Sequence, residues 1–208
     1  KEDGTFRLDQ KYFNYATGLT MTNEKFNKLF DQKPRNPQNE NITQFHMDIA
    51  ASIQKVTEEI MIKLAKSIRK EYGIKNLCLA GGVALNCVAN GKILKEKIFD
   101  KIWIQPAAGD AGCALGAAAL LERPIHFTPY LGVNATRQLT SQQYADAILQ
   151  GKIVAVIEGQ AEFGPRALGN RSLLCLPSDD NIKKLNKIKN RDEDSWRPYA
   201  PICQKETA

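Results

Sequence analysis

With 208 residues, of which 43% are hydrophobic and 25% charged, the chain has the composition of a soluble globular protein with room for one large or two small domains. The net charge of +6 is spread along the chain and not gathered in basic blocks interleaved with aromatic residues, which argues against nucleic acid as a partner. No run of about 18 apolar residues is present, so the sequence predicts neither a membrane-spanning helix nor a membrane partner.

The five cysteines and two histidines carry no metal-site pattern. The cysteines are odd in number, lie mostly in apolar runs and form no CxxC pair, so zinc-finger spacing is absent. Buried, reduced thiols are usual in the cytoplasm, and we therefore expect a cytoplasmic protein. His46 and His126 belong to no ligand pair by spacing, and we expect a solvated or helix-capping role for each.

The first part of the chain predicts helices within turn-rich segments. Aromatic residues near the start indicate a strand or hairpin edge, and Thr22 is a candidate N-cap of a short helix. From Asp48 to Tyr72, apolar residues recur at the 3.6-residue spacing of a long amphipathic helix. Gly73 suits the position that follows its last turn.

Two segments with the order strand, glycine turn and helix come next. The first has a short buried strand at Asn76–Ala80, the Gly81-Gly82 turn and a helix that starts near Ala84. The second has a strand at Lys101–Gln105, the loop Pro-Ala-Ala-Gly-Asp-Ala-Gly and a helix of small residues. This alternation is typical of a parallel α/β sheet. Because both turns leave strands at the same sheet edge, we expect them to converge.

The rest of the chain predicts a smaller second domain. Residues 126–139 are rich in proline and turn residues, so we interpret them as a linker between a domain at 1–125 and another at 140–208. Thr140 and Gln143 have the spacing of a capping box that opens a helix. Strands are expected at 153–157 and 172–176, a glycine-rich charged segment between them, and a basic helix at 181–190.

The predicted sheet edge gathers groups that can hold a nucleotide and a metal. Main-chain N–H groups at a helix N-terminus favour phosphate, and Gly81 and Gly82 permit its close approach. Asp110 lies among glycines after a strand, where a carboxylate can bind a divalent metal or a ribose hydroxyl. Its alternative role is that of a turn-forming or capping residue. Asn86 and Asn90 can bind a ligand or serve as ordinary polar helix positions.

Arginines form a second candidate site. Arg166 and Arg171 bracket the glycine-rich segment, and Ser172 adds a hydroxyl. Guanidinium groups bind phosphate or carboxylate through paired hydrogen bonds, so together with Arg197 this pattern predicts an anion pocket. An ion network with Glu162, or with the acidic residues 192–194, is an equal alternative.

Recognised catalytic motifs leave the reaction open. The Gly81-Gly82 turn is neither a Walker A loop nor a GxGxxG fingerprint. No glycine elbow surrounds a candidate nucleophile, and no Ser-His-Asp or Cys-His order is present. Residue chemistry alone therefore supports a phosphate or nucleotide crevice and an arginine-lined anion site, without naming a reaction.

Five segments of the sequence, taken together, carry a family resemblance. They are residues 48–54, 77–90, 106–116, 162–172 and 197–201. In this order they closely resemble the O-carbamoyltransferases of the NodU/CmcH type, relatives of nodulation and antibiotic-tailoring enzymes. The resemblance implies an α/β fold: the second half of an actin-like, sugar-kinase-type (ribonuclease H-like) domain, followed by part of an α+β YrdC-like domain.

The resemblance also implies a reaction. In such enzymes ATP and carbamoyl phosphate give a carbamoyl-adenylate in the YrdC-like domain, and the carbamoyl group then passes to a substrate hydroxyl in the actin-like domain. A divalent metal, iron or magnesium, is the implied cofactor beside ATP. The expected partners are carbamoyl phosphate and a hydroxyl-bearing small molecule.

Site residues can be carried over by motif from this resemblance. It makes Asp110 a metal ligand. It assigns the adenylate site to Gly81, Gly82, Asn86, Gly109 and Gly112. It assigns the grip on carbamoyl phosphate to Arg166, Arg171 and Ser172, with Arg197 as a weaker match. No general base for the acceptor hydroxyl is visible in the sequence.

The chain departs from the family pattern in length. Family members are much longer, and neither His46 nor His126 matches their paired metal-binding histidines. We therefore predict a fragment that does not catalyse the full reaction alone, an expectation that detectable carbamoyl transfer by these 208 residues would overturn. Two alternatives are a tRNA threonylcarbamoyl-type transferase, against which the segment from Glu162 to Ser172 argues, and a nucleotide-binding actin-like module without transferase activity.

Overall fold

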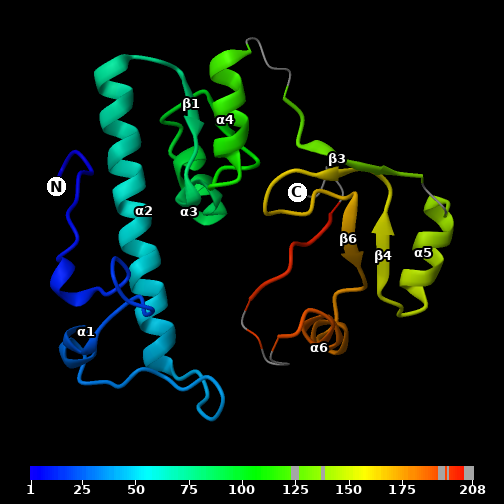
Figure 1. The fold of residues 1–208 in the computed structure, drawn as a ribbon, viewed down its shortest axis with the longest axis horizontal. Helices are drawn as coiled ribbons and strands as arrows, with labels where there is room; N and C mark the ends of the chain where they lie inside the picture. The colour runs from blue at the N-terminus through cyan, green and yellow to red at the C-terminus, as the bar shows by residue number, and fades with distance from the viewer. Residues whose placement is uncertain (123–126, 137–138, 192–194, 196, 204–208) are drawn as a thin grey trace. The chain divides into compact units, whose positions relative to one another are not determined.

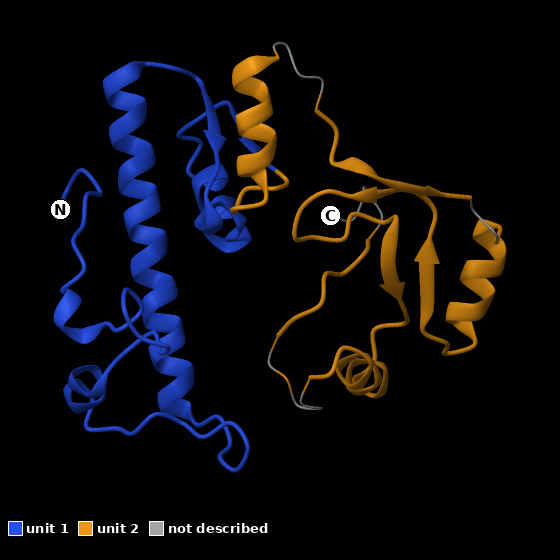
Figure 2. Ribbon diagram, viewed as in Figure 1, with its two compact units in different colours: residues 1–105 blue, residues 106–208 orange. Residues whose placement is uncertain are grey.

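The computed structural model describes residues 1–122, 127–136, 139–191, 195 and 197–203. The chain divides into two compact units, Lys1–Gln105 (unit 1) and Pro106–Ala208 (unit 2), shown in Figure 2. Both mix helices with short strands, so the fold is a mixed α/β fold. The break falls before residue 125, where the sequence places the end of the first domain. Among the described residues, no helix combines the length and apolar character needed to cross a membrane.

Unit 1 consists of helices and a two-stranded parallel sheet (Figure 1). In chain order its elements, with η for a 3-10 helix, are η1 (Gln10–Tyr12), α1 (Glu24–Leu29), α2 (Gln44–Tyr72), β1 (Asn76–Leu79), η2 (Gly82–Leu85), α3 (Cys87–Lys95) and β2 (Lys101–Ile104). The parallel pairing of β1 with β2, in which Leu77 lies opposite Ile102, confirms the predicted arrangement. Both strands therefore end at the same edge.

The long helix α2 begins at Gln44, earlier than the predicted Asp48. Thr43 is its N-cap, and the N–H of Thr43 donates to Nδ1 of His46 at 3.0 Å. His46 therefore lies in the first turn as a capping residue, a position that Glu or Gln usually fills. The helix ends at Tyr72, and Gly73 adopts the left-handed conformation that the sequence predicts.

The N-terminal segment differs in detail from its prediction. The predicted hairpin edge is a 3-10 turn, η1, followed by a single antiparallel bridge between Phe13 and Thr22. The N-cap of α1 is Asn23 and not Thr22, because the Asn23 side chain accepts the N–H of Lys25. Both residue types cap helices well, so the sequence alone does not separate the two neighbours.

The core of unit 1 joins α2, α3 and the sheet. Its buried residues are Ala65, Ile93 and Phe99, and partly buried side chains pack against them: Met61, Ile62, Leu77, Ile98 and Ile102. Fully burying a side chain of the Ile or Phe type stabilises a fold by roughly 1.5–3 kcal/mol. This packing fixes the strand ends from which the Gly81-Gly82 turn departs.

A polar network also links α2 to α3. Glu58 of α2 is only 4% exposed and forms an ion pair with Nζ of Lys92 on α3. Nε2 of Gln54 donates to Oε1 of Glu58 at 2.9 Å. The hydrogen bond from Lys92, followed by that from Gln54, holds the pKa of Glu58 below its usual value of 4.5.

We expect Glu58→Gln to destabilise the chain in a pH-dependent manner. Because the folded-state pKa of Glu58 is lowered, the stabilisation is complete above about pH 4.5 and is lost as the pH falls through the folded-state value. In urea unfolding, the free energy of unfolding of wild type should therefore exceed that of the variant near neutral pH, and this difference should become smaller on acidification. Glu59→Gln is the control, because Glu59 is exposed and 3.9 Å from Lys55. A gap for Glu58→Gln that stays constant with pH would contradict the ionised pair.

Unit 2 contains two small antiparallel sheets and three helices among its described residues (Figure 1). The elements are α4 (Gly112–Leu121), β3 (Tyr130–Ala135), α5 (Ser141–Leu149), β4 (Val154–Ile157), β5 (Gly159–Glu162), β6 (Arg171–Leu174) and α6 (Asp179–Ile188). Strand β3 pairs with β5, and β4 pairs with β6. The segment predicted as a linker at 126–139 thus contains a paired strand, and its residues 126, 137 and 138 lie outside the described residues.

The predicted helix start at Thr140 is confirmed. The N–H of Gln143 donates to Oγ1 of Thr140 at 3.2 Å, and the N–H of Thr140 donates to Oε1 of Gln143 at 2.8 Å. This reciprocal capping box begins α5 where the sequence pattern places it. Helix α6 begins at Asp179, earlier than the predicted residue 181, because Ser178 caps it.

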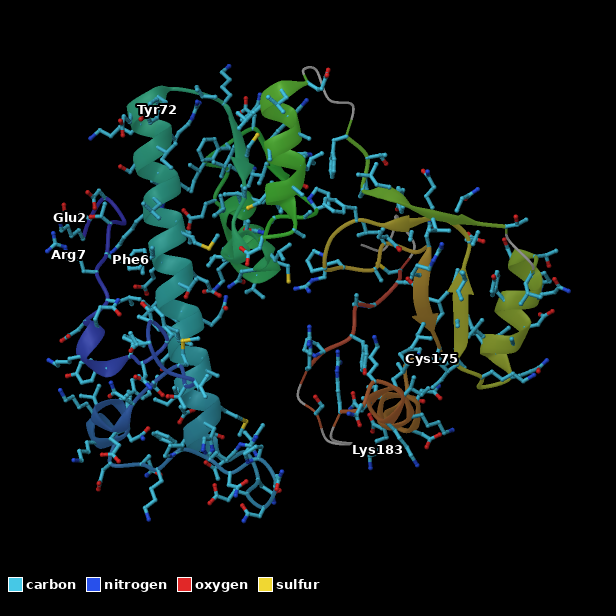
Figure 3. All side chains as sticks on the ribbon, in the orientation of Figure 1. Glu2, Phe6, Arg7, Tyr72, Cys175 and Lys183 are labelled. Carbon is cyan, nitrogen blue, oxygen red and sulfur yellow. The ribbon has the colours of Figure 1, made fainter. Side chains whose placement is uncertain are left out.

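The predicted burial of the cysteines is wrong. Cys78, Cys87, Cys113 and Cys203 are exposed, and Cys175, which follows β6, is half-buried (Figure 3). Cys78 lies on β1, and a two-stranded sheet leaves alternate strand positions uncovered. Partial burial raises the pKa of the Cys175 thiol, which keeps it protonated and poorly nucleophilic.

Candidate functional site

Two of the segments singled out in the sequence meet within unit 2. We name residues 106–112 the Asp110 turn and residues 163–170 the Arg166 loop. Gly164 approaches the Asp110 turn so closely that a Cβ added to it would lie 2.8 Å from the carbonyl oxygen of Pro106. A Cβ added to Gly112 would lie 2.2 Å from the carbonyl oxygen of Ala107. The Pro106–Ala107 main chain is therefore packed between two glycines, which brings the two segments together.

Asp110 is exposed at the tip of its turn. The N–H of Cys113 donates to the main-chain oxygen of Asp110 at 3.0 Å, but Ala111 is the N-cap of α4, and no side chain caps that helix. Of the two alternative roles predicted for Asp110, that of a capping residue is thus not adopted, whereas the residue does lie in a turn. Within the described chain the carboxylate makes no hydrogen bond, so it can bind a ligand from outside.

The metal predicted at Asp110 needs more ligands than this carboxylate. Mg²⁺ is bound in octahedral geometry, with several oxygen ligands around it. Among the residues that the structure describes, no group of three or more His, Cys, Asp or Glu side chains could hold a metal ion. Asp110 is therefore a candidate for one ligand, and the described residues contain no cluster of such side chains that would complete a metal site.

Glu162 holds the Arg166 loop from inside. Its Oε1 accepts the main-chain N–H of Leu168 at 2.7 Å, of Asn170 at 2.8 Å and of Arg171 at 3.1 Å. Partial burial acts to raise the pKa of Glu162, but these N–H donors outweigh it and keep the pKa below its usual 4.5. Among the described residues Glu162 pairs with no arginine, so the predicted ion network with Glu162 is not formed there. The alternative network with residues 192–194 lies outside the described residues.

Arg171 binds the main chain on the other side of this loop. Its guanidinium donates to the carbonyl oxygens of Glu158 at 2.9 Å, Asn170 at 2.7 Å, Val133 at 2.8 Å and Gly159 at 3.2 Å. These contacts connect β3, β5 and the start of β6. The guanidinium group is thus engaged by carbonyls of its own chain.

Arg166 differs from Arg171 in its surroundings. It is exposed and forms no hydrogen bond or ion pair with the described part of the chain. Ser172 is half-buried in β6, opposite Val156, and Arg197 is exposed near the end of the described residues. Of the three arginines predicted at the anion site, Arg166 lies on the loop at 163–170, and its guanidinium has no partner among the described residues.

The Gly81-Gly82 turn of unit 1 is exposed. Gly81 has a φ of +96°, and a Cβ added to either glycine would meet nothing within 4 Å. A 3-10 turn, η2, follows in place of the α-helix predicted from Ala84, and α3 starts only at Cys87. Because Asp110 belongs to unit 2, the predicted convergence of the two turns stays a prediction.

Asn86 and Asn90 serve the fold of unit 1. Oδ1 of Asn86 accepts the N–H of Ala89 at 3.1 Å, which caps α3, and its Nδ2 donates to Gln54 at 2.9 Å. Asn90 is buried, and its Nδ2 donates to the carbonyl oxygen of Ala84 at 2.7 Å. The observed contacts match the structural alternative for both residues, and a ligand role for Asn86 stays a prediction.

Family comparisons agree with the resemblance noted in the sequence. A family model described as "Carbamoyltransferase N-terminus" matches residues 1–119, and one described as "Carbamoyltransferase C-terminus" matches residues 145–208. The chain belongs to the carbamoyltransferase family. The Asp110 turn lies in the first matched region and the Arg166 loop in the second, so the contact between Gly164 and Pro106 joins residues of both regions.

Three curated relatives are each much longer than this chain. The uncharacterized protein sll1178 of Synechocystis sp. is 44% identical over 97% of this chain and 38% of its own length. Nodulation protein NolO of Bradyrhizobium diazoefficiens is 39% identical over 80% of the chain and 35% of its own length. Nodulation protein U of Azorhizobium caulinodans is 29% identical over 94% of the chain and 37% of its own length. The chain spans little more than a third of these relatives.

The role of Glu162 was missed in the sequence of this carbamoyltransferase-family chain. The sequence suggests arginines as its partners, whereas the structure shows main-chain N–H groups. A usable signal exists, because a carboxylate directly before a loop of glycine and asparagine can accept successive main-chain N–H groups. Tyr130 was missed as well, and its hydroxyl donates to the carbonyl oxygen of Leu168 at 3.0 Å.

Proposed function

We propose that this chain is part of a longer enzyme that transfers a carbamoyl group from carbamoyl phosphate to a hydroxyl of a small molecule, through a carbamoyl-adenylate made with ATP. Membership of the carbamoyltransferase family supports the carbamoyl chemistry. The observation that carries the proposal is the packing of Gly164 on Pro106, because it brings an exposed arginine and an exposed carboxylate of two matched regions onto neighbouring segments.

Arg166 is the residue that we assign to the phosphate of carbamoyl phosphate. A guanidinium group forms charge-assisted, paired hydrogen bonds with phosphate oxygens, and such bonds are about twice as strong as neutral ones. Because Arg166 has no partner in the described chain, binding breaks no hydrogen bond between this arginine and the described residues. Ser172 and Arg197 are secondary candidates for binding this phosphate. Arg171 contributes to the site indirectly, because its guanidinium holds the main chain of the loop.

The ATP and metal assignments are part of the same proposal. The exposed turn of Gly81 and Gly82 offers main-chain N–H groups to nucleotide phosphates. In unit 2, Gly109 and Gly112 flank Asp110, which we propose as one ligand of a divalent metal, iron or magnesium. Since the described residues contain no group of three or more His, Cys, Asp or Glu side chains that could hold the ion, no step of the reaction is assigned to the metal.

Carbamoyl phosphate binding to the full-length protein tests the proposal. We expect Arg166→Ala to weaken binding about 10- to 100-fold in isothermal titration calorimetry, because charge-assisted hydrogen bonds are lost. Arg166→Lys should give an intermediate affinity, since it keeps the charge without the fork. Lys183→Ala removes an equal charge from the exposed face of α6 (Figure 3) and should bind like wild type.

Two results would contradict the proposal. Unchanged affinity in Arg166→Ala would remove Arg166 from the anion site. A full-length protein that binds ATP but not carbamoyl phosphate would favour the nucleotide-binding module without transferase activity.

A further inference from the structure

The Arg166 loop contains a nest of main-chain N–H groups that is filled by the chain's own carboxylate. Donors from Leu168, Asn170 and Arg171 converge on a single oxygen, Oε1 of Glu162, at 2.7 to 3.1 Å. Concave groups of main-chain N–H donors are usually sites for an external anion. Here Glu162, at the end of β5, supplies the anion from within the loop that it closes.

The hydrogen bonds to this internal carboxylate offset the conformational entropy that is lost when the loop is fixed in one conformation. The loop runs from residue 163 to 170 without regular secondary structure, and two of its residues, Gly164 and Gly169, have positive φ. Fixing each loop residue costs about 1–2 kcal/mol of conformational entropy. Charge-assisted hydrogen bonds are among the strongest that a carboxylate forms. Three of them between the loop's end and its start therefore favour one loop conformation.

Glu162 and Arg171 act on opposite main-chain groups. Glu162 accepts N–H groups, whereas the guanidinium of Arg171 donates to four carbonyl oxygens. Together they provide charged hydrogen-bond partners for three N–H groups and four carbonyl groups at the base of the loop. Arg166, which lies between them in sequence, takes part in neither set of contacts and stays exposed.

We propose that Glu162 is a positioning residue of the anion site: its carboxylate fills the N–H nest and thereby fixes the loop that presents Arg166 to phosphate. The identity of the anion rests on the proposed function, whereas the fixing of the loop does not. Glu162 itself touches no substrate. Its removal changes affinity through the conformation of the loop.

Amide exchange and binding, measured together in the full-length protein, test this role. In Glu162→Ala we expect hydrogen exchange at the amides of Leu168, Asn170 and Arg171 to be about 10-fold faster or more, since each loses its acceptor. Carbamoyl phosphate should bind about 10-fold more weakly, because the loop that presents Arg166 is no longer held in one conformation and must be ordered on binding. Glu162→Gln should give intermediate values, because its side-chain carbonyl can still accept. Added acetate should restore protection in Glu162→Ala by refilling the nest.

Controls separate the positioning role from a general loss of fold. Asp146→Asn removes an equal charge from an exposed site on α5 and should change neither exchange nor affinity. Exchange within α6 should be unchanged in the Glu162 variants. If Glu162→Ala loses its secondary structure in circular dichroism, the same readouts in Glu162→Gln decide.

The outcomes also separate this inference from the proposed function. Faster loop exchange in Glu162→Ala, with no carbamoyl phosphate binding even in wild type, would refute the proposed ligand and support the fixing of the loop. Unchanged exchange and affinity in both Glu162 variants, with binding lost in Arg166→Ala, would refute the positioning role and leave the proposed function standing.

Discussion

Gly164→Ala is expected to lower the free energy of unfolding by about 2–6 kcal/mol and to weaken carbamoyl phosphate binding. The φ of Gly164 is +122°, and holding a side-chain-bearing residue there costs roughly 1–3 kcal/mol. The new Cβ would also lie 2.8 Å from the carbonyl oxygen of Pro106, and overpacking of this kind costs about 1–3 kcal/mol. Urea unfolding followed by circular dichroism measures the stability loss.

Gly169→Ala is the matched control for this prediction. Gly169 lies in the same loop and has a similar φ of +111°, but a Cβ there would meet nothing within 4 Å. Its substitution therefore carries the backbone strain without the contact. The difference between the two variants reports the packing against Pro106. An equal loss of stability would show that this contact contributes nothing.

Much of the fold follows from local sequence patterns. The α2 helix repeats apolar residues at helical spacing, and Thr140 with Gln143 marks the start of α5, so both helices were predicted from the sequence. Strand β3 was not, because prolines and turn residues surround it and its partner β5 lies beyond α5 in the chain. Pairings between distant segments leave little trace in local composition.

The candidate site shows the same limit at the level of hydrogen bonds. Residue types identify Asp110 and Arg166 as candidate ligand-binding residues, since carboxylates and arginines in glycine-rich loops can be recognised in a sequence. The partners of Glu162 and Arg171 were not visible, because they are main-chain groups. Every residue offers the same main-chain groups, so only the loop conformation decides which of them a charge binds.

The structure also changes the relative importance of the predicted residues. Arg166 and Arg171 were equivalent as candidate phosphate ligands. Their surroundings now differ, since the guanidinium of Arg171 is held by four carbonyls while that of Arg166 has no partner in the described chain. We therefore expect substitution of Arg171 to act through folding of the loop, and substitution of Arg166 to act on the anion directly.

Gly112→Ala tests the packing on the other side of the Pro106–Ala107 segment. Two opposing effects decide whether it raises or lowers the free energy of unfolding. Alanine is favoured over glycine within a helix by about 1 kcal/mol, and Gly112 opens α4. Against this, the added Cβ would lie 2.2 Å from the carbonyl oxygen of Ala107, a main-chain atom of a residue only 1% exposed. Because buried main chain cannot move aside easily, we expect the contact to dominate, with a net loss of up to about 2 kcal/mol in the free energy of unfolding.

Gly109→Ala, in the same turn, shows what happens without that contact. A Cβ at Gly109 would meet nothing within 4 Å, and its φ lies outside the left-handed region, so the variant should be neutral or more stable by up to about 1 kcal/mol. Urea unfolding should therefore show that the two variants change the free energy of unfolding in opposite directions or by clearly different amounts. Wild-type stability in Gly112→Ala would mean that the Ala107 carbonyl yields to the new side chain, and that the turn carrying Asp110 is not held by this packing.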